Sequence, residues 1–92
     1  MDLLTHHARA RMQQRGISAA TLDALLDFGR TAPAGAGCEV VFFDRKARER
    51  LTRAGVISPS DADRICNSYA IVESAGAVIT VGHRYRRIPR GR

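Results

Sequence analysis

The chain has 92 residues, of which 45% are hydrophobic and 26% charged, and its formal net charge at pH 7 is +6. This length predicts one domain, residues 1–92, with a modest hydrophobic core. No apolar run approaches the roughly 20 residues that cross a bilayer, and two isolated cysteines fit neither a disulfide framework nor a zinc site. The first residues lack the pattern of a secretory signal, so we expect a soluble cytoplasmic protein without metal or cofactor.

Basic residues are concentrated at the two ends of the chain. Residues 83–92 contain five arginines and no acidic residue, and residues 1–15 contain three arginines against one aspartate. All three histidines lie in the same two segments: His6, His7 and His83. Arginine presents a planar fork that suits phosphate. The distribution therefore predicts a polyanionic partner, either nucleic acid or an acidic protein.

A first helix is predicted between Thr5, which suits an N-cap, and Gly16, which ends it. Its apolar residues recur with helical spacing: Leu4, Ala8 and Met12. A second row follows the edge of this stripe at intervals of four residues: His7, Arg11 and Arg15. The opposite face, which includes His6, is expected to face water.

A second helix is predicted from Ser18 to a stop at Gly29, so that the two helices form an αα-hairpin. Ile17 and Leu22 occupy the positions of a hydrophobic staple. The face predicted to be buried consists of Leu22, Leu25 and Leu26. Residues 31–37 are small and rich in Gly, Ala and Pro, which predicts a loop.

A short strand at 38–43 leads into a basic helix at 44–53, capped by Asp44. A Schellman ending is expected at Gly55, with Val56 against Leu51. Most of the helix surface is basic, and a solvated face is its simplest explanation.

Another helix is predicted from Ser58, with Pro59 and Asp61 in its first turn. Its buried stripe is expected to be Ala62, Ile65 and Cys66.

Two strands close the chain, at 69–73 and 77–87, joined by a turn at 75–76. The favoured register pairs Ala70 with Val81 and Val72 with Ile79. It gives one apolar face, to be covered by helices: Ala70, Val72, Ala77, Ile79 and Val81. The fold class is therefore α+β, with two N-terminal helices packed on a small antiparallel sheet of three or four strands. A helical insertion at 44–67 precedes the C-terminal hairpin.

Three segments carry a resemblance to a known family. They read H-A-x-x-R-M-x-x-R-G-I at 7–17, V-F-F-D-x-K-A-R-x-R-L at 41–51 and V-I-T-V-G-H-R at 78–84. The chain resembles small bacterial proteins classed as domain of unknown function 4258, thought to be related to RelE, barnase and colicin type ribonuclease toxins. The resemblance implies a RelE/barnase-like sheet with helices against one face and an open opposite face. A ribonuclease role is implied at one further remove, because fold does not fix function.

Metal-independent cleavage of RNA needs a base for the 2′-hydroxyl, an acid for the leaving oxygen and cationic donors for the phosphate. The candidate catalytic residues are His7, Arg11, Thr80 and His83. The candidates for binding nucleic acid are Arg15, Arg84, Tyr85, Arg86 and Arg87. Neighbouring strand residues face opposite ways, so His83 and Arg84 can meet one phosphate only if the strand bends near Gly82.

The leading hypothesis is a toxin-like endoribonuclease acting on cellular RNA. It requires the first helix and the last strand to lie side by side, so that their cationic side chains converge on one anion pocket. One alternative is a module without chemistry that docks on nucleic acid or on an acidic protein, such as an antitoxin or a topoisomerase subunit. The other is a small accessory interaction protein. Each candidate also has a structural explanation: a half-buried His7, a strand-forming Thr80 and a solvated arginine tail.

Overall fold

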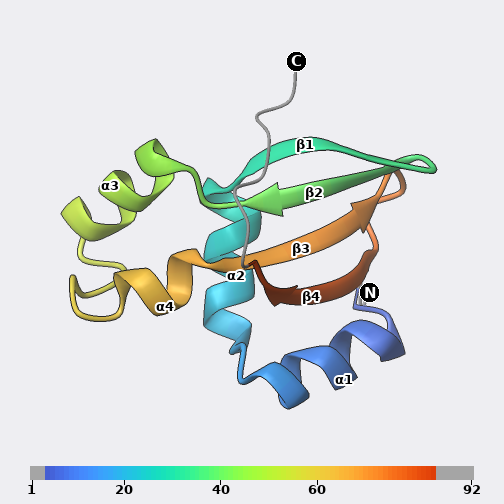
Figure 1. Ribbon diagram of the computed structural model, residues 1–92, viewed down its shortest axis with the longest axis horizontal. Helices are drawn as coiled ribbons and strands as arrows, with labels where there is room; N and C mark the ends of the chain where they lie inside the picture. The colour runs from blue at the N-terminus through green and yellow to red at the C-terminus, as the bar shows by residue number, and fades with distance from the viewer. Residues whose placement is uncertain (1–3, 85–92) are drawn as a thin grey trace.

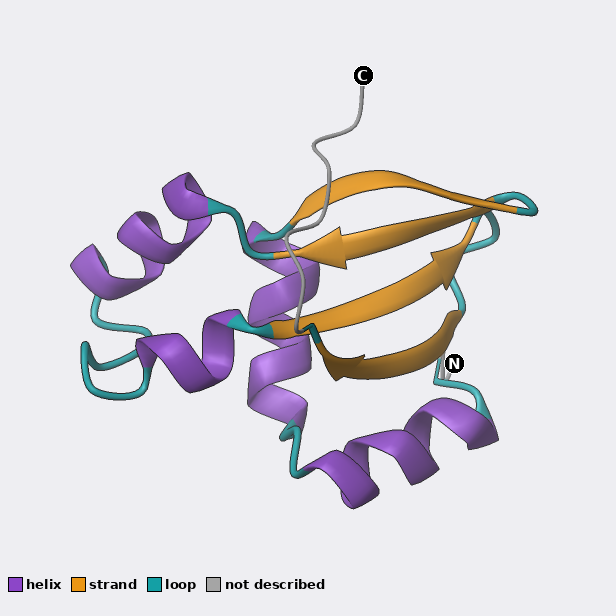
Figure 2. Cartoon of the chain, viewed as in Figure 1, coloured by secondary structure: helices purple, strands orange, loops and turns teal. Residues whose placement is uncertain are grey.

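The computed structural model of the protein describes residues 4–84. Its elements are α1 His6–Arg15, α2 Ala19–Phe28, β1 Arg30–Gly35, β2 Cys38–Phe42, α3 Arg45–Arg53, α4 Ala62–Cys66, β3 Ser68–Glu73 and β4 Val78–His83. The strands form one antiparallel sheet in the order β1-β2-β3-β4 (Figure 2). Helices α1 and α2 cover one face of the sheet, and α3 and α4 lie beyond one end of it (Figure 1). The predicted α+β class and the helical insertion before the last hairpin are confirmed.

Helix α1 forms where the sequence predicts it. The hydroxyl of Thr5 accepts a hydrogen bond from the N–H of Ala8 at 3.1 Å, and Gly16 ends the helix in a left-handed conformation with φ 65°. Ala8 is completely buried, and Leu4 and Met12 pack against the core. The N–H of Thr5 also donates to the carbonyl oxygen of Val78 at 3.1 Å, which places the start of α1 beside the start of β4.

Helix α2 departs from the prediction on its buried face. Leu22 and Leu25 are buried as expected, but Leu26 is 46% exposed and Ala24 is buried instead. Gly29 follows the helix in an extended conformation, not a left-handed one. A Cβ at Gly29 would lie 2.3 Å from the carbonyl oxygen of Leu25, so this glycine allows a close approach of the backbone.

The loop predicted at 31–37 is wrong, because most of it forms the edge strand β1. Arg30 pairs with Phe42 and Thr31 with Val41, so the backbone hydrogen bonds offered by β2 outweigh the weak strand propensity of Ala, Pro and Gly. An edge strand tolerates Pro33, since a proline there need not donate to a neighbour. The turn that follows has positive φ at both Ala36 and Gly37, as a type I′ hairpin requires.

The register of the last hairpin is half right. Ala70 pairs with Val81 as predicted, but Val72 pairs with Val78 because Ile79 is an extra residue in a β-bulge. The extra residue shifts the alternation of side chains by one position at the start of β4. Val78 therefore faces the helices and is buried, whereas Ile79 is not. Strand β4 ends at His83, short of the predicted end at residue 87, and residues 85–87 lie outside the described part of the chain.

The insertion begins as predicted. Asp44 caps α3 by accepting from the N–H of Ala47 at 2.8 Å, and the N–H of Val56 donates to the carbonyl oxygen of Leu51 at 3.0 Å in a Schellman motif. The next helix starts later than expected, at Ala62, because residues 58–61 form a separate turn. Among residues 4–84, none of the helices is long and apolar enough to cross a membrane.

Candidate nucleic-acid interface

Arg84 is held in place immediately after β4. Its backbone N–H donates to the carbonyl oxygen of Asn67, and its Nη2 donates to the carbonyl oxygen of Phe43, both at 2.7 Å. Its guanidinium carbon lies 5.3 Å from the centroid of the Phe42 ring. Arginine carries five N–H donors, so the contact with Phe43 leaves most of them available. The guanidinium is therefore held in one position while most of its N–H groups can still donate to a ligand.

A pocket of about 230 Å³ lies around this guanidinium, and we call it the Arg84 pocket. Its lining residues are Phe43, Asp44, Arg45, Arg48, Cys66, Asn67 and Arg84. They come from the end of β2, the first turns of α3, the end of α4 and the end of β4. Three segments far apart in the sequence therefore supply one concavity at the end of the sheet.

Positive charge dominates the lining of the Arg84 pocket. Three arginines face one carboxylate, that of Asp44, and this carboxylate caps α3 and pairs with Arg30 at 3.5 Å. Arg48 forms an ion pair with Asp63 at 2.5 Å, but the Asp63 side chain is 85% exposed, so solvent screens the pair. The arrangement suits an anion that accepts several N–H groups at once, such as a phosphate.

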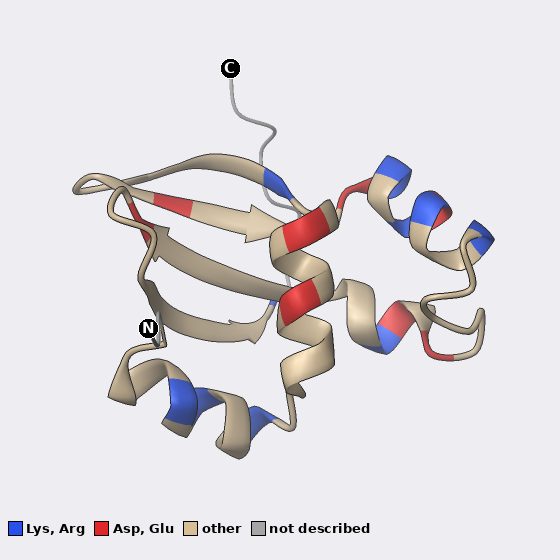
Figure 3. Cartoon of the chain, turned by 180° about the vertical axis from the view of Figure 1, so that it is seen from behind, with Lys and Arg blue, Asp and Glu red and all other residues tan. Residues whose placement is uncertain are grey.

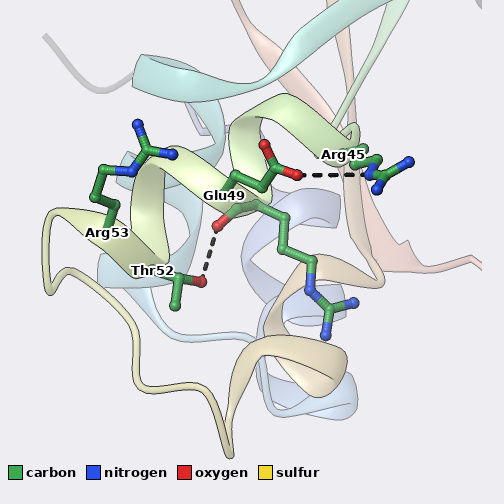
Figure 4. A pocket seen from close by; sticks show the side chains of 5 residues that line it. Arg45, Glu49, Thr52 and Arg53 are labelled. Atoms are coloured by element: carbon green, nitrogen blue, oxygen red, sulfur yellow. Dashed lines mark hydrogen bonds and ion pairs between the residues drawn. The ribbon is translucent and has the colours of Figure 1, made fainter.

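A second, more open hollow of about 540 Å³ continues along the surface of α3. It is lined by Arg45, Arg48, Glu49, Thr52 and Arg53, and it therefore shares Arg45 and Arg48 with the Arg84 pocket. Figure 4 shows these side chains projecting from successive turns of the helix, with Glu49 paired to Arg45 at 3.5 Å. Arg53 makes no ion pair with a described residue. A cationic surface thus leads from the pocket along α3.

The charges are unevenly distributed over the molecule. Viewed from the helix-covered side, basic residues lie on α1 and α3, and the outer surface of α2 between them is acidic (Figure 3). The acidic residues of α2 are Asp23 and Asp27, and α2 contains no basic residue. The two basic helices are therefore separate surfaces.

His7 and Arg11 are paired on α1. The Nε of Arg11 donates to Nε2 of His7 at 3.4 Å, and its Nη1 donates to the side-chain oxygen of Gln14 at 3.2 Å. His7 is exposed, as is Arg15 in the last turn. The predicted row along α1 therefore exists on the surface of the helix.

His83 and Thr80 lie on opposite faces of β4. His83 pairs with Ser68 and alternates with Gly82, so it lies on the helix-covered side and is half-buried. Thr80 pairs with Ile71 on the open face and is also half-buried. Arg84 follows on the open side, so His83 and Arg84 point apart, as strand geometry predicts.

The structure does not bring the two candidate histidines together. Thr5, two residues before His7, is bonded to Val78 and Ile79 at the start of β4. His83 is at the other end of the strand, about 13 Å beyond Ile79 at the usual rise per residue. Neither histidine lines the Arg84 pocket. Of the binding candidates, Tyr85, Arg86 and Arg87 lie outside the described residues.

Cys66 is the buried ionisable group of the Arg84 pocket. Burial raises the pKa of its thiol above the ordinary value of 9.0, and the charges of Arg48 and Arg84 offset this only in part. The thiol therefore stays protonated at neutral pH and is a poor nucleophile. Within residues 4–84, no three His, Cys, Asp or Glu side chains gather closely enough to hold a metal ion.

The sequence did not predict a binding role for Arg45 and Arg48, which were attributed to a solvated helix face. It also did not predict a role for Tyr69. The register places Tyr69 on the open face, between Phe42 and Gly82. The available signal for Tyr69 was an aromatic residue opposite a glycine, on the face of the predicted hairpin that is not apolar throughout. Helix propensity alone gave no sign that Arg45 and Arg48 would approach Arg84.

The chain matches the model of one protein family over residues 4–83, and that family is described as "Domain of unknown function (DUF4258)". No curated protein and no solved structure matches the chain. The likeness to RelE, barnase and colicin toxins remains a hypothesis.

Proposed function

This chain belongs to the DUF4258 family of domains of unknown function, and we propose that it binds single-stranded RNA by gripping phosphate in the Arg84 pocket. One observation supports this proposal above all. The Arg84 guanidinium is held by the Phe43 carbonyl and the Phe42 ring in the same concavity as Arg45 and Arg48.

Preorganisation is the physical reason. A free arginine loses rotamer entropy when it binds, which costs up to about 2 kcal/mol. Arg84 has already lost much of this freedom on folding, so more of the energy of a phosphate contact appears as affinity. The hollow along α3 gives the backbone of the nucleic acid a cationic path beyond the first phosphate.

Binding of fluorescently labelled single-stranded RNA, followed by anisotropy over a range of salt concentrations, tests the proposal. Three phosphate contacts predict a slope of log K against log salt of about −2 for single strands. Arg84→Gln and Arg48→Gln should each weaken binding and make this slope shallower by about 0.7. Arg9→Gln, on the exposed surface of α1, is the matched control for loss of one positive charge.

Two results would contradict the proposal. One is equal binding by Arg84→Gln, Arg48→Gln and Arg9→Gln. The other is binding to poly-glutamate but not to RNA, which would favour an acidic protein partner, such as an antitoxin, for the same arginines.

The His7–Arg11 hydrogen bond favours a second candidate function, a toxin-like endoribonuclease. The bond places an imidazole beside a cation that can contact phosphate, and Nε2 of His7 can serve as a base once Arg11 turns from it to the phosphate. The acid for the leaving oxygen would come from a group other than His83, given its position at the far end of β4.

RNA incubated with the protein in the presence of a chelator tests this candidate. Cleavage should leave cyclic-phosphate ends and should fall at least a hundredfold in His7→Ala. Full activity in both His7→Ala and His83→Ala would show that the assignment of the histidines is wrong. Absence of cleavage by the wild type would rule out the endoribonuclease, and the proposal of RNA binding would stand in either case. Induced expression of the same variants in bacteria would show whether growth stops with RNA cleavage.

A further inference from the structure

Tyr69 leans across the sheet onto β4. It pairs with Gly82 on the open face, and its Cε1, Oη and Cζ atoms lie 3.0, 3.0 and 3.1 Å from the position that a Cβ on Gly82 would occupy. The ring rests on this strand because Gly82 has no side chain. Tyr69 is half-buried, and no helix within residues 4–84 covers the sheet face that carries it (Figure 1).

The Tyr69 ring is adjacent to the Arg84 pocket. Phe42, Tyr69 and Gly82 form one row across three strands, and Arg84 is two residues beyond Gly82 with its guanidinium over the Phe42 ring. Tyr69 and Arg84 are therefore diagonal neighbours on adjacent strands. Residues in this relation lie about 7–8 Å apart. A single nucleotide bridges such a separation between its base and its phosphate.

We propose that Tyr69 stacks on one RNA base while the Arg84 pocket holds the phosphate of that nucleotide or of its neighbour. The inference rests on the proposed function and adds the aromatic half of the site. Phe42 is only 2% exposed beneath Arg84, so it supports the guanidinium and is not available to a base. Tyr69 is the aromatic side chain of this row that is open to solvent in part.

Stacking of this kind requires an unpaired base. A base inside a duplex is covered on both faces, whereas a single strand offers its bases to aromatic side chains. Every base has a π-face, so the Tyr69 contact should be tolerant of sequence. The site would then select single strands over duplexes without selecting a sequence.

An abasic substitution separates the base contact from the phosphate contact. The wild type should bind a short RNA about tenfold more tightly than the same RNA with its bases removed at the bound positions. Tyr69→Leu should lose this preference, while its affinity for the abasic strand stays at the wild-type value. Tyr69→Phe, which keeps the ring, should retain the preference.

Tyrosine fluorescence provides a readout in a folded chain with the ring intact. The protein has two tyrosines and no tryptophan, so Tyr69 is the sole emitter in Tyr85→Phe. Its emission should be quenched by RNA and not by the abasic strand, since a stacked base quenches the ring and a phosphate does not.

The outcomes distinguish the two proposals. A preference for bases that survives in Tyr69→Leu, or RNA binding without quenching, overturns the role of Tyr69 and leaves phosphate binding in place. Failure of the wild type to bind either strand overturns both.

Discussion

The hydroxyl of Thr5 donates a hydrogen bond of 3.0 Å to the carbonyl oxygen of Ile79, 74 positions away in the chain. The Thr5 hydroxyl oxygen in turn accepts a hydrogen bond from the N–H of Ala8 and so caps α1. Ile79 is the extra residue of the bulge in β4. One side chain therefore starts the first helix and fastens it to the irregular point of the last strand.

Replacing Thr5 should separate these two elements. Thr5→Val keeps the shape but removes the cap and the bond to Ile79, and it should lower the free energy of unfolding by about 2 kcal/mol. Thr5→Ser keeps a hydroxyl and should remain within about 0.5 kcal/mol of the wild type. Urea denaturation measures both. A stable Thr5→Val together with a destabilised Thr5→Ser would mean that the methyl group, and not the hydroxyl, matters.

Gly82 and Tyr69 should be energetically coupled. A Cβ at position 82 would push against the Tyr69 ring, so Gly82→Ala should destabilise the protein by about 1–2 kcal/mol. In a Tyr69→Ala background the obstacle is gone, and Gly82→Ala should become neutral or stabilising by about 0.5 kcal/mol, as expected for Gly→Ala within a strand. Thermal or urea unfolding of the four proteins completes the cycle. Additive effects would show that the ring does not rest on Gly82.

Cys66 should make stability depend on pH in the alkaline range. Burial raises the pKa of this thiol above 9.0, so the folded state keeps the proton that the unfolded chain loses. The corresponding contribution is fully present below pH 9 and is lost as pH rises through the folded pKa. The free energy of unfolding should therefore fall more steeply above pH 9 in the wild type than in Cys66→Ala. Parallel curves would contradict the raised pKa.

The same thiol reports on the arginines around it. Arg48 and Arg84 lower the pKa of Cys66 against the effect of burial. In a Cys38→Ser background, Arg84→Gln should therefore slow the reaction of Cys66 with a thiol reagent at pH 8, where the thiolate is the reactive form. Unchanged or faster reaction would show that the charge is not felt at Cys66 or that the pocket has opened.

Local signals in the sequence predicted the ends of α1, α2 and α3, but not the start of α4. Thr5, Ser18 and Asp44 cap their helices as expected, and Gly55 completes the Schellman ending of α3. Each of these motifs depends on residues within one or two turns of each other, so spacing alone identifies it.

The errors come from contacts between distant segments. Strand β1 is poor in strand-forming residues and exists because β2 supplies partners for its backbone. The bulge at Ile79 inserts one residue that the alternation of apolar side chains does not reveal. Arg84 was named from the sequence, but Arg45 and Arg48 reach it only because the insertion folds back to the end of β4. Spacing along the chain contains no information about such packing.

Arg84→Lys distinguishes a shaped phosphate site from simple attraction by charge. Lysine keeps the positive charge, so the salt slope of RNA binding should stay within about 0.2 of the wild-type value. It cannot reproduce the planar fork that contacts the Phe43 carbonyl and the Phe42 ring together. Affinity for RNA should therefore fall by about three- to tenfold at every salt concentration, and the unfolding free energy by about 1 kcal/mol.

Arg53→Lys is the matched control for Arg84→Lys, because Arg53 lies on the exposed surface of α3 and makes no ion pair with a described residue. Its affinity and its unfolding free energy should both stay at wild-type values, since a solvated guanidinium and a solvated ammonium attract phosphate similarly. If Arg84→Lys binds RNA as tightly as Arg53→Lys does, the fixed geometry of Arg84 contributes nothing. RNA would then be held by charge alone, without a built pocket.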